Sequence, residues 1–428
     1  MASFMQQANL SRVLISAHFL LLMLITRCSL DPILNMTKVG GIGIGALLNL
    51  AVIAYGVVAF SKYRREIPLF LVKTWGIFLA SGIISIILSP VMMQSVRSFA
   101  SVVTYFVIFS LPFFLVRSRD DAKFLLRLIM LSSIIPIFYG LFEFVVFGGT
   151  NSVQGKRIFS TFSHPNIFAF YLVLVLSLSL FFLKSTQFKM SIRFRKWMLN
   201  AAIFGLVLLV LTKTRSAWAA FVMVVLVYGI MSEKKYLLYL AVAGGLAMLI
   251  PSIQERIVDI FSGNDADSLS SGEALNSYAW RKVVWESSWS YIENKPFLGH
   301  GYDTFKYYFL GFFPLEGEKI FDAHNVYVQI VFDMGFLGVL GYFCIFSCVL
   351  YRLFKYRRYD PKGGAVLIGL VCSYMLVGYS DNMLFYLSFN WYFWLVCGIF
   401  CALANRPELF TDSSENTLKT TNQTGHLE

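Results

Sequence analysis

Long apolar runs separated by short polar turns recur along the chain up to residue 404. Most runs are roughly 15 to 25 residues long, and about 20 apolar residues in a helix cross the hydrocarbon core of a bilayer. The pattern therefore predicts an all-α polytopic membrane protein with about twelve transmembrane helices. The expected spans are 13–27, 39–60, 68–88, 99–116, 122–147, 166–183, 198–212, 216–231, 236–250, 325–350, 364–380 and 384–404.

The composition agrees with this class of protein. The chain of 428 residues is 57% hydrophobic and 14% charged, whereas soluble domains carry about 25% charged residues. The formal net charge of +12 is therefore interpreted as a sign of membrane topology. We expect membrane lipids around the chain and no nucleic-acid partner.

The distribution of lysine and arginine predicts the orientation. If the N-terminus is cytoplasmic, the cytoplasmic turns carry a clear excess of these cations over the short turns on the other side. Turns 184–196 and 352–362 are the most basic of them. Since cytoplasmic loops are enriched in Lys and Arg, both termini are expected inside, and the long loop 251–324, between the ninth and tenth spans, is expected outside.

The chain is expected to form one transmembrane domain, 1–404. It includes loop 251–324, in which a helix rich in tryptophan is predicted at 278–294 and ends before Pro296. Tryptophans on a short outer helix are typical of a helix at the membrane interface. Residues 405–428 are polar and are predicted to be a disordered cytoplasmic tail.

The stretch LTKTRSAW, 211–218, places two cations in an outward-facing turn. Lys213 and Arg215 stand there against the charge bias, as does Arg157 in an earlier outer turn. Cations in this place suggest a local anionic partner. The alternative is that they are cations at helix ends, with no functional role, whose charged groups reach the interface.

Three of the five histidines, at positions 164, 300 and 324, fall near the outer face. The sequence has no H-x-x-H or H-E-x-x-H pair and no glycine-rich phosphate loop, and its D-x-D pattern, Asp265 and Asp267, falls in the small, polar outer stretch 262–277. We therefore expect neither a metal site nor a cofactor. An isolated histidine is most often a hydrogen-bonded structural residue, but several on one face favour a functional cluster.

Arginines and a histidine at an outer membrane face fit one kind of chemistry. Arginine binds phosphate or pyrophosphate through its fork of N–H donors. Histidine can accept a proton from an attacking hydroxyl group. A pyrophosphate-bearing substrate at this surface would be a lipid-linked sugar.

Four stretches, in this order, resemble the bacterial O-antigen ligase/polymerase family. They are RIFSTFSHPNIFAFYL, LTKTRSAWAAF, WRKVVWESSWSYIENKPFLGHGYDTF and AHNVYVQIVFDMGFLGVLGYF. The resemblance implies a GT-C-class, metal-independent, inverting glycosyltransferase of the bacterial inner membrane, with its active site facing the periplasm. Such an enzyme moves a glycan from undecaprenyl pyrophosphate to lipid A–core, as a ligase, or to another lipid-linked glycan, as a polymerase.

The resemblance also implies roles for particular residues. Arg215 and Arg281 match arginines expected to bind the pyrophosphate, and His324 matches a histidine that activates the acceptor hydroxyl or orients the donor. Asn325 would support His324. Further substrate-binding residues are expected at Arg157, Asn166 and Lys213, whereas His300, in a glycine-containing turn, is interpreted as structural.

Several alternatives remain open at this stage. Ligase is favoured slightly over polymerase, and nothing in the sequence identifies the acceptor. A polysaccharide-related transporter or flippase would have a similar number of spans, with Glu143 and Asp381 as its main intramembrane acidic residues, and a receptor or structural scaffold is a third class. Asp303 or Asp322 could replace His324 as the base.

Overall fold

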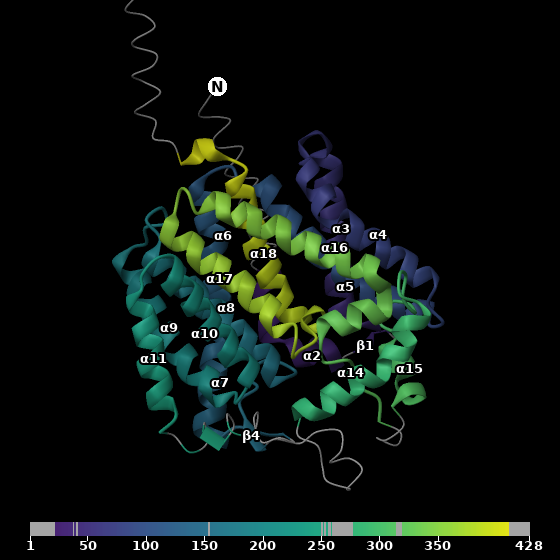
Figure 1. Cartoon of the computed structure of the whole chain (residues 1–428). Coiled ribbons are helices and arrows are strands. Elements are labelled where there is room, and N and C mark those ends of the chain that lie inside the picture. Colours follow the sequence, from purple (N-terminus) through teal and green to yellow (C-terminus); the bar gives the residue numbers. More distant parts are fainter. Residues whose placement is uncertain are drawn as a thin grey trace, which may run out of the picture.

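A computed structural model of the chain describes residues 22–36, 38–39, 42–152, 155–249, 251, 254–255, 258, 277–313 and 319–410. Helices dominate this part of the chain (Figure 1). They are α2 (Asp31–Met36), α3 (Ile44–Lys62), α4 (Leu69–Ile87), α5 (Met92–Leu115), α6 (Arg119–Ser132), α7 (Ile134–Phe147), α8 (Pro165–Lys184), α9 (Ile192–Leu211), α10 (Arg215–Met231), α11 (Lys235–Ala247), α14 (Ser277–Asn294), α15 (Phe305–Phe312), α16 (Val326–Tyr356), α17 (Pro361–Val377) and α18 (Leu387–Ala404). Two small antiparallel hairpins pair β1 (Lys38–Val39) with β2 (Ile42–Gly43), and β3 (Thr150–Ser152) with β4 (Gly155–Arg157).

The prediction of an all-α polytopic protein is confirmed in its main features. Eight helical segments of the described chain are long and apolar enough to cross a membrane, and α10, α11 and α17 are shorter apolar helices. Each predicted span from the second onward coincides with such a segment. The first predicted span, 13–27, lies mostly outside the described residues, which include only a helical stretch at 22–29.

Some local features differ from the expectation. The predicted span 122–147 consists of two helices, α6 and α7, with a break at Ser133. Pro136 lies in the first turn of α7, where its missing N–H group is tolerated, whereas in the middle of one long helix it would remove a hydrogen bond. Helix α15 and the two hairpins were not predicted.

The folded domain also extends beyond residue 404, where the tail was expected to begin. Residues Pro407–Leu409 form a short 3-10 turn, the Phe410 ring stacks on Tyr359 with 4.9 Å between centroids, and Arg406 donates to the Phe113 carbonyl. The start of the predicted tail is therefore corrected to a position after Phe410. Residues 411–428 lie outside the described part of the chain.

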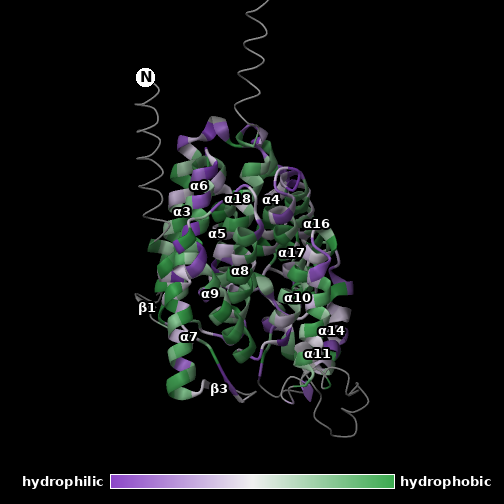
Figure 2. Cartoon of the chain, turned by 90° about the vertical axis from the view of Figure 1, so that its left-hand side faces the viewer, coloured by the Kyte–Doolittle hydropathy of each residue, from purple (hydrophilic) through white to green (hydrophobic). Residues whose placement is uncertain are grey.

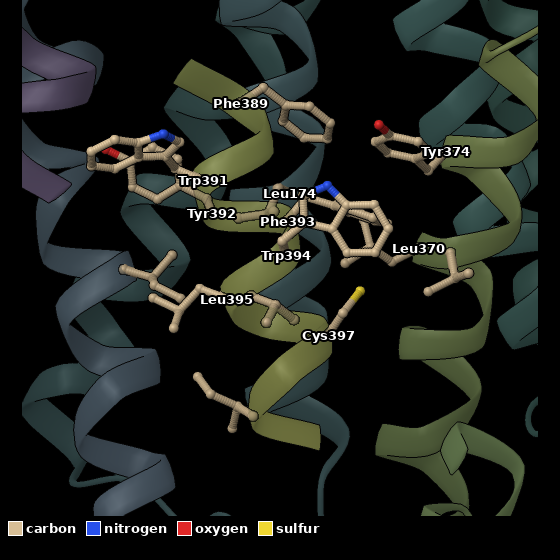
Figure 3. Close-up of a cluster of buried hydrophobic side chains, with 14 of the residues drawn as sticks. Leu174, Leu370, Tyr374, Phe389, Trp391, Tyr392, Phe393, Trp394, Leu395 and Cys397 are labelled. Atoms are coloured by element: carbon tan, nitrogen blue, oxygen red, sulfur yellow. The ribbon is translucent and has the colours of Figure 1, made fainter. Parts of the chain in front are cut away.

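Helices α8 and α18 form the centre of the bundle. The apolar window of α18 is 94% buried and that of α8 is 83% buried. Large aromatic side chains of α18 pack against α17, as Figure 3 shows for Phe393 and Tyr374, whose ring centroids lie 4.1 Å apart. On another side, Trp394 contacts Trp75 of α4, with 4.9 Å between ring centroids. Gly398 allows α5 to approach, because a Cβ atom there would meet the Phe109 carbonyl oxygen at 2.2 Å.

Apolar residues, green in Figure 2, run along the length of the outer helices, and many of their side chains are exposed. Val145, Val58 and Ile203 are each at least 60% exposed. In water such a surface would be unfavourable, but it fits a lipid environment.

Ion pairs and hydrogen bonds define the two ends of the bundle. At one end, Glu233 pairs with Lys184, Lys235 and Lys362, which joins the turns after α8, α10 and α16. At the other end lie the first residues of α8, α10, α16 and α18, because each of these helices runs between the two ends. The second end, called the site end below, carries every residue predicted for the functional site.

Candidate functional site

Arg157 joins three segments at the site end. From β4, its Nε donates to the Thr212 carbonyl at 2.7 Å, and its Nη2 donates to Asn166 Oδ1 and Thr214 Oγ1, both at 2.8 Å. The side chain is 6% exposed. Arg157 therefore fixes the α9–α10 turn against the first turn of α8.

The turn held by Arg157 carries the two outward cations of the LTKTRSAW stretch. Lys213 has a positive φ of 54°, and Arg215 is the first residue of α10. A left-handed conformation is unfavourable for a residue with a side chain and persists where the surroundings enforce it, often at functional sites. All four non-glycine residues with positive φ in the described chain, namely Ser160, Lys213, Asp303 and His324, lie in loops at the site end.

Asp381 is a buried carboxylate at the centre of this region, 2% exposed. Its Oδ1 accepts hydrogen bonds from Asn166 Nδ2 at 3.1 Å and from the Tyr386 hydroxyl at 2.7 Å. Through Asn166, Asp381 is linked to Arg157. The segment after α17 is thus tied to α8 and to the Arg157 junction.

Arg281 of α14 reaches the same segment from the outer loop. Its Nη1 donates to the Ser380 carbonyl at 2.7 Å, next to Asp381 in the chain. Its Nε is buried and has no hydrogen-bond partner among the described residues. Arg281 therefore keeps a donor that a ligand oxygen can use.

His324 lies immediately before α16, with φ of 48°. Its ring contacts Trp280 edge-on, with 6.1 Å between centroids, so α14 supplies both an aromatic neighbour and Arg281. Burial and the Arg281 charge lower the pKa of His324, while Asp381 and Asp322 act in the opposite direction. The imidazole is accordingly neutral near pH 7 and able to accept a proton.

His164 belongs to the same group of side chains. It caps α8, with Nδ1 accepting the Asn166 backbone N–H at 3.1 Å. Burial lowers the pKa of His164, as do the charges of Arg157 and His324, and Asp381 opposes them. Hydrogen bonds link Arg157 to Asp381 through Asn166, His164 to Asn166 and Arg281 to Ser380, next to Asp381, while His324 contacts Trp280, the residue before Arg281. We call these two histidines, two arginines and one carboxylate the Arg–His cluster (Arg157, His164, Arg281, His324 and Asp381).

Gln329, one turn into α16, positions the loop that carries His324. Its Oε1 accepts from the Ala323 backbone N–H at 3.2 Å and from Asn382 Nδ2 at 3.0 Å. Its Nε2 donates to Asp333 Oδ2 at 2.8 Å. Ala323, which precedes His324, and Asn382, which follows Asp381, are therefore both held by the side-chain amide of Gln329.

Asp333 connects this network to the outer loop at a break in α16. Its carboxylate accepts the backbone N–H groups of Asp303 and Thr304. Beside it, Gly335 is non-helical, with φ of 63°, and the freed backbone groups pair with the loop: Gly301 N–H donates to the Asp333 carbonyl and Phe336 N–H to that of Pro296. The loop that follows α14 thus has a fixed position against α16.

Two predicted residues have clear structural contacts. Asn325 caps α16, and its Oδ1 accepts the N–H groups of Tyr327 at 2.9 Å and Val328 at 3.2 Å. His300 Nε2 lies 2.7 Å from the Tyr291 carbonyl, and its ring packs on Phe332. These contacts agree with the structural interpretation of His300, and they give Asn325 a positioning role beside His324.

The sequence reasoning missed Asp381 and His164 as parts of the cluster. Asp381 was noted only as an intramembrane acidic residue, although a carboxylate near several outer cations is the signal that could have identified it. His164 occurs in the HPN stretch, but its proximity to His324 depends on tertiary contacts. Among the described residues, no three His, Cys, Asp or Glu side chains form a group suited to a metal ion.

The comparison with protein families agrees with these observations. Residues 200–343 match the family model described as O-Antigen ligase. The matched region contains Lys213, Arg215, Arg281, His324 and Asn325, whereas Arg157 and Asn166 lie before it. A search of curated proteins finds no match.

The match over residues 200–343 confirms the resemblance to the O-antigen ligase family for three of the four stretches, and RIFSTFSHPNIFAFYL lies before it. Together with the apolar helices, it supports a multi-pass membrane protein with a function of the O-antigen ligase or polymerase kind, and hence a glycosyltransferase-like enzyme.

The cap at Asn325 leads to a test of its role. Replacing Asn325 with Ala removes the acceptor for two N–H groups and is expected to lower the free energy of unfolding by about 1 kcal/mol. Asn325→Asp is expected to retain most of the stability, because it keeps the accepting oxygen. Thermal unfolding of the purified protein measures this, with Asn200→Ala, at an exposed position of α9, as the control. An Asn325→Ala protein as stable as the Asn200→Ala control would contradict the capping role.

Proposed function

We propose that this protein transfers a glycan from undecaprenyl pyrophosphate to lipid A–core at the periplasmic face of the bacterial inner membrane. The observation that carries the proposal is the Arg–His cluster, which gathers cations and neutral imidazoles from four separated segments at the site end. The family match to O-antigen ligase over residues 200–343 supports it.

In the proposed reaction, a hydroxyl oxygen of the acceptor attacks the anomeric carbon of the donor glycan. The bond from that carbon to the pyrophosphate oxygen breaks, and the leaving pyrophosphate takes the electron pair. The hydroxyl proton passes to the imidazole of His324. Attack opposite the leaving group inverts the anomeric configuration.

Arg215 and Arg281 would stabilise the negative charge that develops on the leaving pyrophosphate. Arg281 Nε, buried and without a partner among the described residues, is one donor for this purpose. Preorganised donors in a site of low dielectric act strongly on developing charge. In this proposal, the turn that binds the donor is held in place by Arg157, Asn166 and Lys213. Arg157 holds it through hydrogen bonds to Thr212 and Thr214.

In this proposal His324 is preferred to the alternative bases Asp303 and Asp322 because of the contacts that these carboxylates make. Asp322 forms an ion pair with Lys306 at 2.8 Å, so its carboxylate is already engaged by a cation. Asp303 accepts a hydrogen bond from Ser98 on α5. His324 lies beside Arg281 and has no comparable anionic partner in direct contact among the described residues.

The contacts also argue against the transporter alternative. Glu143 accepts hydrogen bonds from the Ser160 backbone N–H and the Thr150 hydroxyl, and Asp381 is held by Asn166 and Tyr386. Both acidic residues are therefore used to fix loops at the site end. Ion-coupled carriers usually keep such groups near the middle of the membrane.

Deletion of the gene in its host is the direct test of the function. We expect bare lipid A–core together with long glycan retained on undecaprenyl pyrophosphate, seen on gels of the extracted lipopolysaccharide and lipid-linked glycan. Single repeat units in place of long chains would establish polymerisation instead. If neither the lipopolysaccharide nor the lipid-linked glycan changed, the result would contradict both ligation and polymerisation of this glycan.

Arg215 is expected to be essential for transfer. Removing one donor to the developing charge costs roughly 100-fold to 1000-fold in kcat, so Arg215→Ala should lose at least about 100-fold in purified enzyme. Arg215→Lys should recover little, because a point charge does not replace the fork of donors. Arg193→Ala, at an exposed position at the opposite end of α9, is the control. Unchanged transfer by a folded Arg215→Ala protein would contradict the role.

The acid side of the pH profile tests His324 as the base. Because Arg281 lowers the pKa of His324, Arg281→Gln should raise that pKa and move the acid limb of kcat/KM to higher pH. Arg215→Gln should reduce the rate without moving the limb, because Arg215 is not among the groups that shift this pKa. An acid limb that stays in place in Arg281→Gln, or moves to lower pH, would contradict the assignment.

A further inference from the structure

A second polar site lies next to the Arg–His cluster, in a cavity of about 220 Å³. Serine, tyrosine and apolar side chains line it, together with one ion pair. The residues that matter here are Arg27, Asp31, Ser101, Tyr105 and Phe385. They come from the end of the first helical stretch, from α2, from α5 and from the segment before α18.

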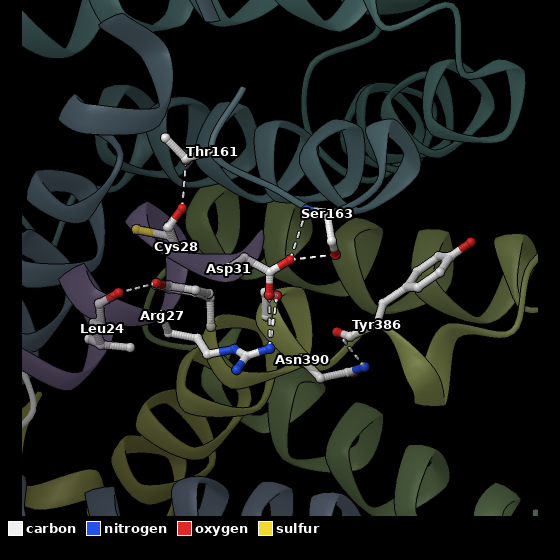
Figure 4. A network of polar contacts seen from close by, with 10 residues as sticks. Leu24, Arg27, Cys28, Asp31, Thr161, Ser163, Tyr386 and Asn390 are labelled. Atoms are coloured by element: carbon white, nitrogen blue, oxygen red, sulfur yellow. Dashed lines mark hydrogen bonds and ion pairs between the residues drawn. The ribbon is translucent and has the colours of Figure 1, made fainter. Parts of the chain in front are cut away.

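Asp31 is fully occupied by protein donors (Figure 4). Its Oδ1 pairs with Arg27 Nη2 at 2.9 Å and also accepts the Ser388 hydroxyl. Its Oδ2 accepts the backbone N–H of Ser163 at 2.9 Å and the hydroxyl of Ser163 at 2.6 Å. Asp31 is 0% exposed and Arg27 is 1% exposed. Because both carboxylate oxygens of Asp31 already accept two hydrogen bonds each, they do not pair with the remaining N–H donors of the Arg27 guanidinium group.

Two N–H groups of the Arg27 guanidinium are therefore not used by Asp31. Its Nε and Nη1 are buried and have no hydrogen-bond partner among the described residues. A buried donor that stays unpaired is unfavourable, above all when it belongs to a charged group. In a cavity wall, such donors favour a ligand that brings oxygen atoms.

The cavity adjoins the Arg–His cluster through two short stretches of chain. Ser163 lines the cavity three residues before Asn166, and Leu384 lines it three residues after Asp381. Between them, Tyr386 donates its hydroxyl to Asp381 at 2.7 Å. A molecule in the cavity would therefore lie at the edge of the Arg–His cluster, near His164 and Asp381.

We infer that this cavity binds a saccharide unit of the glycan acceptor, an inference that rests on the proposed transferase function. The Arg27–Asp31 ion pair has no net charge and therefore suits neutral hydroxyl groups. A phosphate in the cavity would be repelled by the buried Asp31 carboxylate. Tyr105 and Phe385 provide aromatic surface for the apolar face of a sugar ring. At about 30 Å³ per water, the cavity has the room of about seven water molecules, which is enough for one sugar ring.

Filling the cavity is the first test. Ser101→Phe places a large side chain in it and leaves both residues of the ion pair unchanged, and Val96→Phe, at a 46% exposed position on the same helix, is the matched control. Transfer is measured with purified full-length protein, lipid-linked O-antigen as donor and lipid A with a complete core as acceptor. We expect Ser101→Phe to raise the KM for the acceptor at least about tenfold and to leave the KM for the donor unchanged.

Arg27→Lys is a second, conservative variant. It keeps a cation beside Asp31 but removes the spare Nε and Nη1 donors, so the acceptor KM should rise about tenfold, as for the loss of one hydrogen bond from a charged donor. Thermal stabilisation by synthetic undecaprenyl pyrophosphate should stay as in the unmodified protein. A raised donor KM in either variant, or an unchanged acceptor KM in a folded Ser101→Phe protein, would overturn the inference.

A binding measurement separates this inference from the proposed function. Saturation-transfer NMR with delipidated core oligosaccharide should show binding to the unmodified protein and to Val96→Phe, and loss of binding in Ser101→Phe. If the unmodified protein binds the oligosaccharide but transfers nothing, the transferase proposal fails and the saccharide site remains. If transfer proceeds and Ser101→Phe still binds and uses the acceptor normally, the saccharide site is wrong.

Discussion

A buried carboxylate among cations is the interaction on which the site end depends. Asp381, 2% exposed, connects α8 with the segment before α18 through Asn166 and Tyr386. Around it, Arg157 and Arg281 would repel each other in a region of low dielectric if no anion were present. The carboxylate therefore allows cations from β4 and α14 to lie near one another before any substrate arrives.

The same region concentrates unfavourable backbone conformations. Lys213 and His324 both have positive φ, which is costly for residues with side chains. Each is held by neighbours that are themselves well bonded: Arg157 fixes the turn around Lys213, and Gln329 fixes the residue before His324. The rigid bundle thus stabilises loops that would not adopt these shapes alone.

The sequence was sufficient for the helices and for the identity of most cluster residues, because hydrophobic runs and local motifs are readable without tertiary contacts. It placed Arg281 and His324 on one face through topology, and the structure brings them together beside Asp381. The role of Asn325 was not readable, since the residue before a helix can cap it or face a ligand, and here it caps α16. The Arg27–Asp31 pair joins residues four apart, but its contacts with Ser163 and Ser388 span more than 100 residues, so the cavity beside it could not be inferred from spacing.

The break at Gly335 divides α16 into two rods. The outer rod begins just after His324, and its Asp333 carbonyl accepts the Gly301 backbone N–H, while Phe336 of the inner rod donates its backbone N–H to the Pro296 carbonyl. Helices in bilayers tilt to match the local thickness of the hydrocarbon core. Because the loop that follows α14 is hydrogen-bonded on both sides of Gly335, it fixes the angle between the rods, so a tilt of α16 would carry the imidazole and the outer loop together.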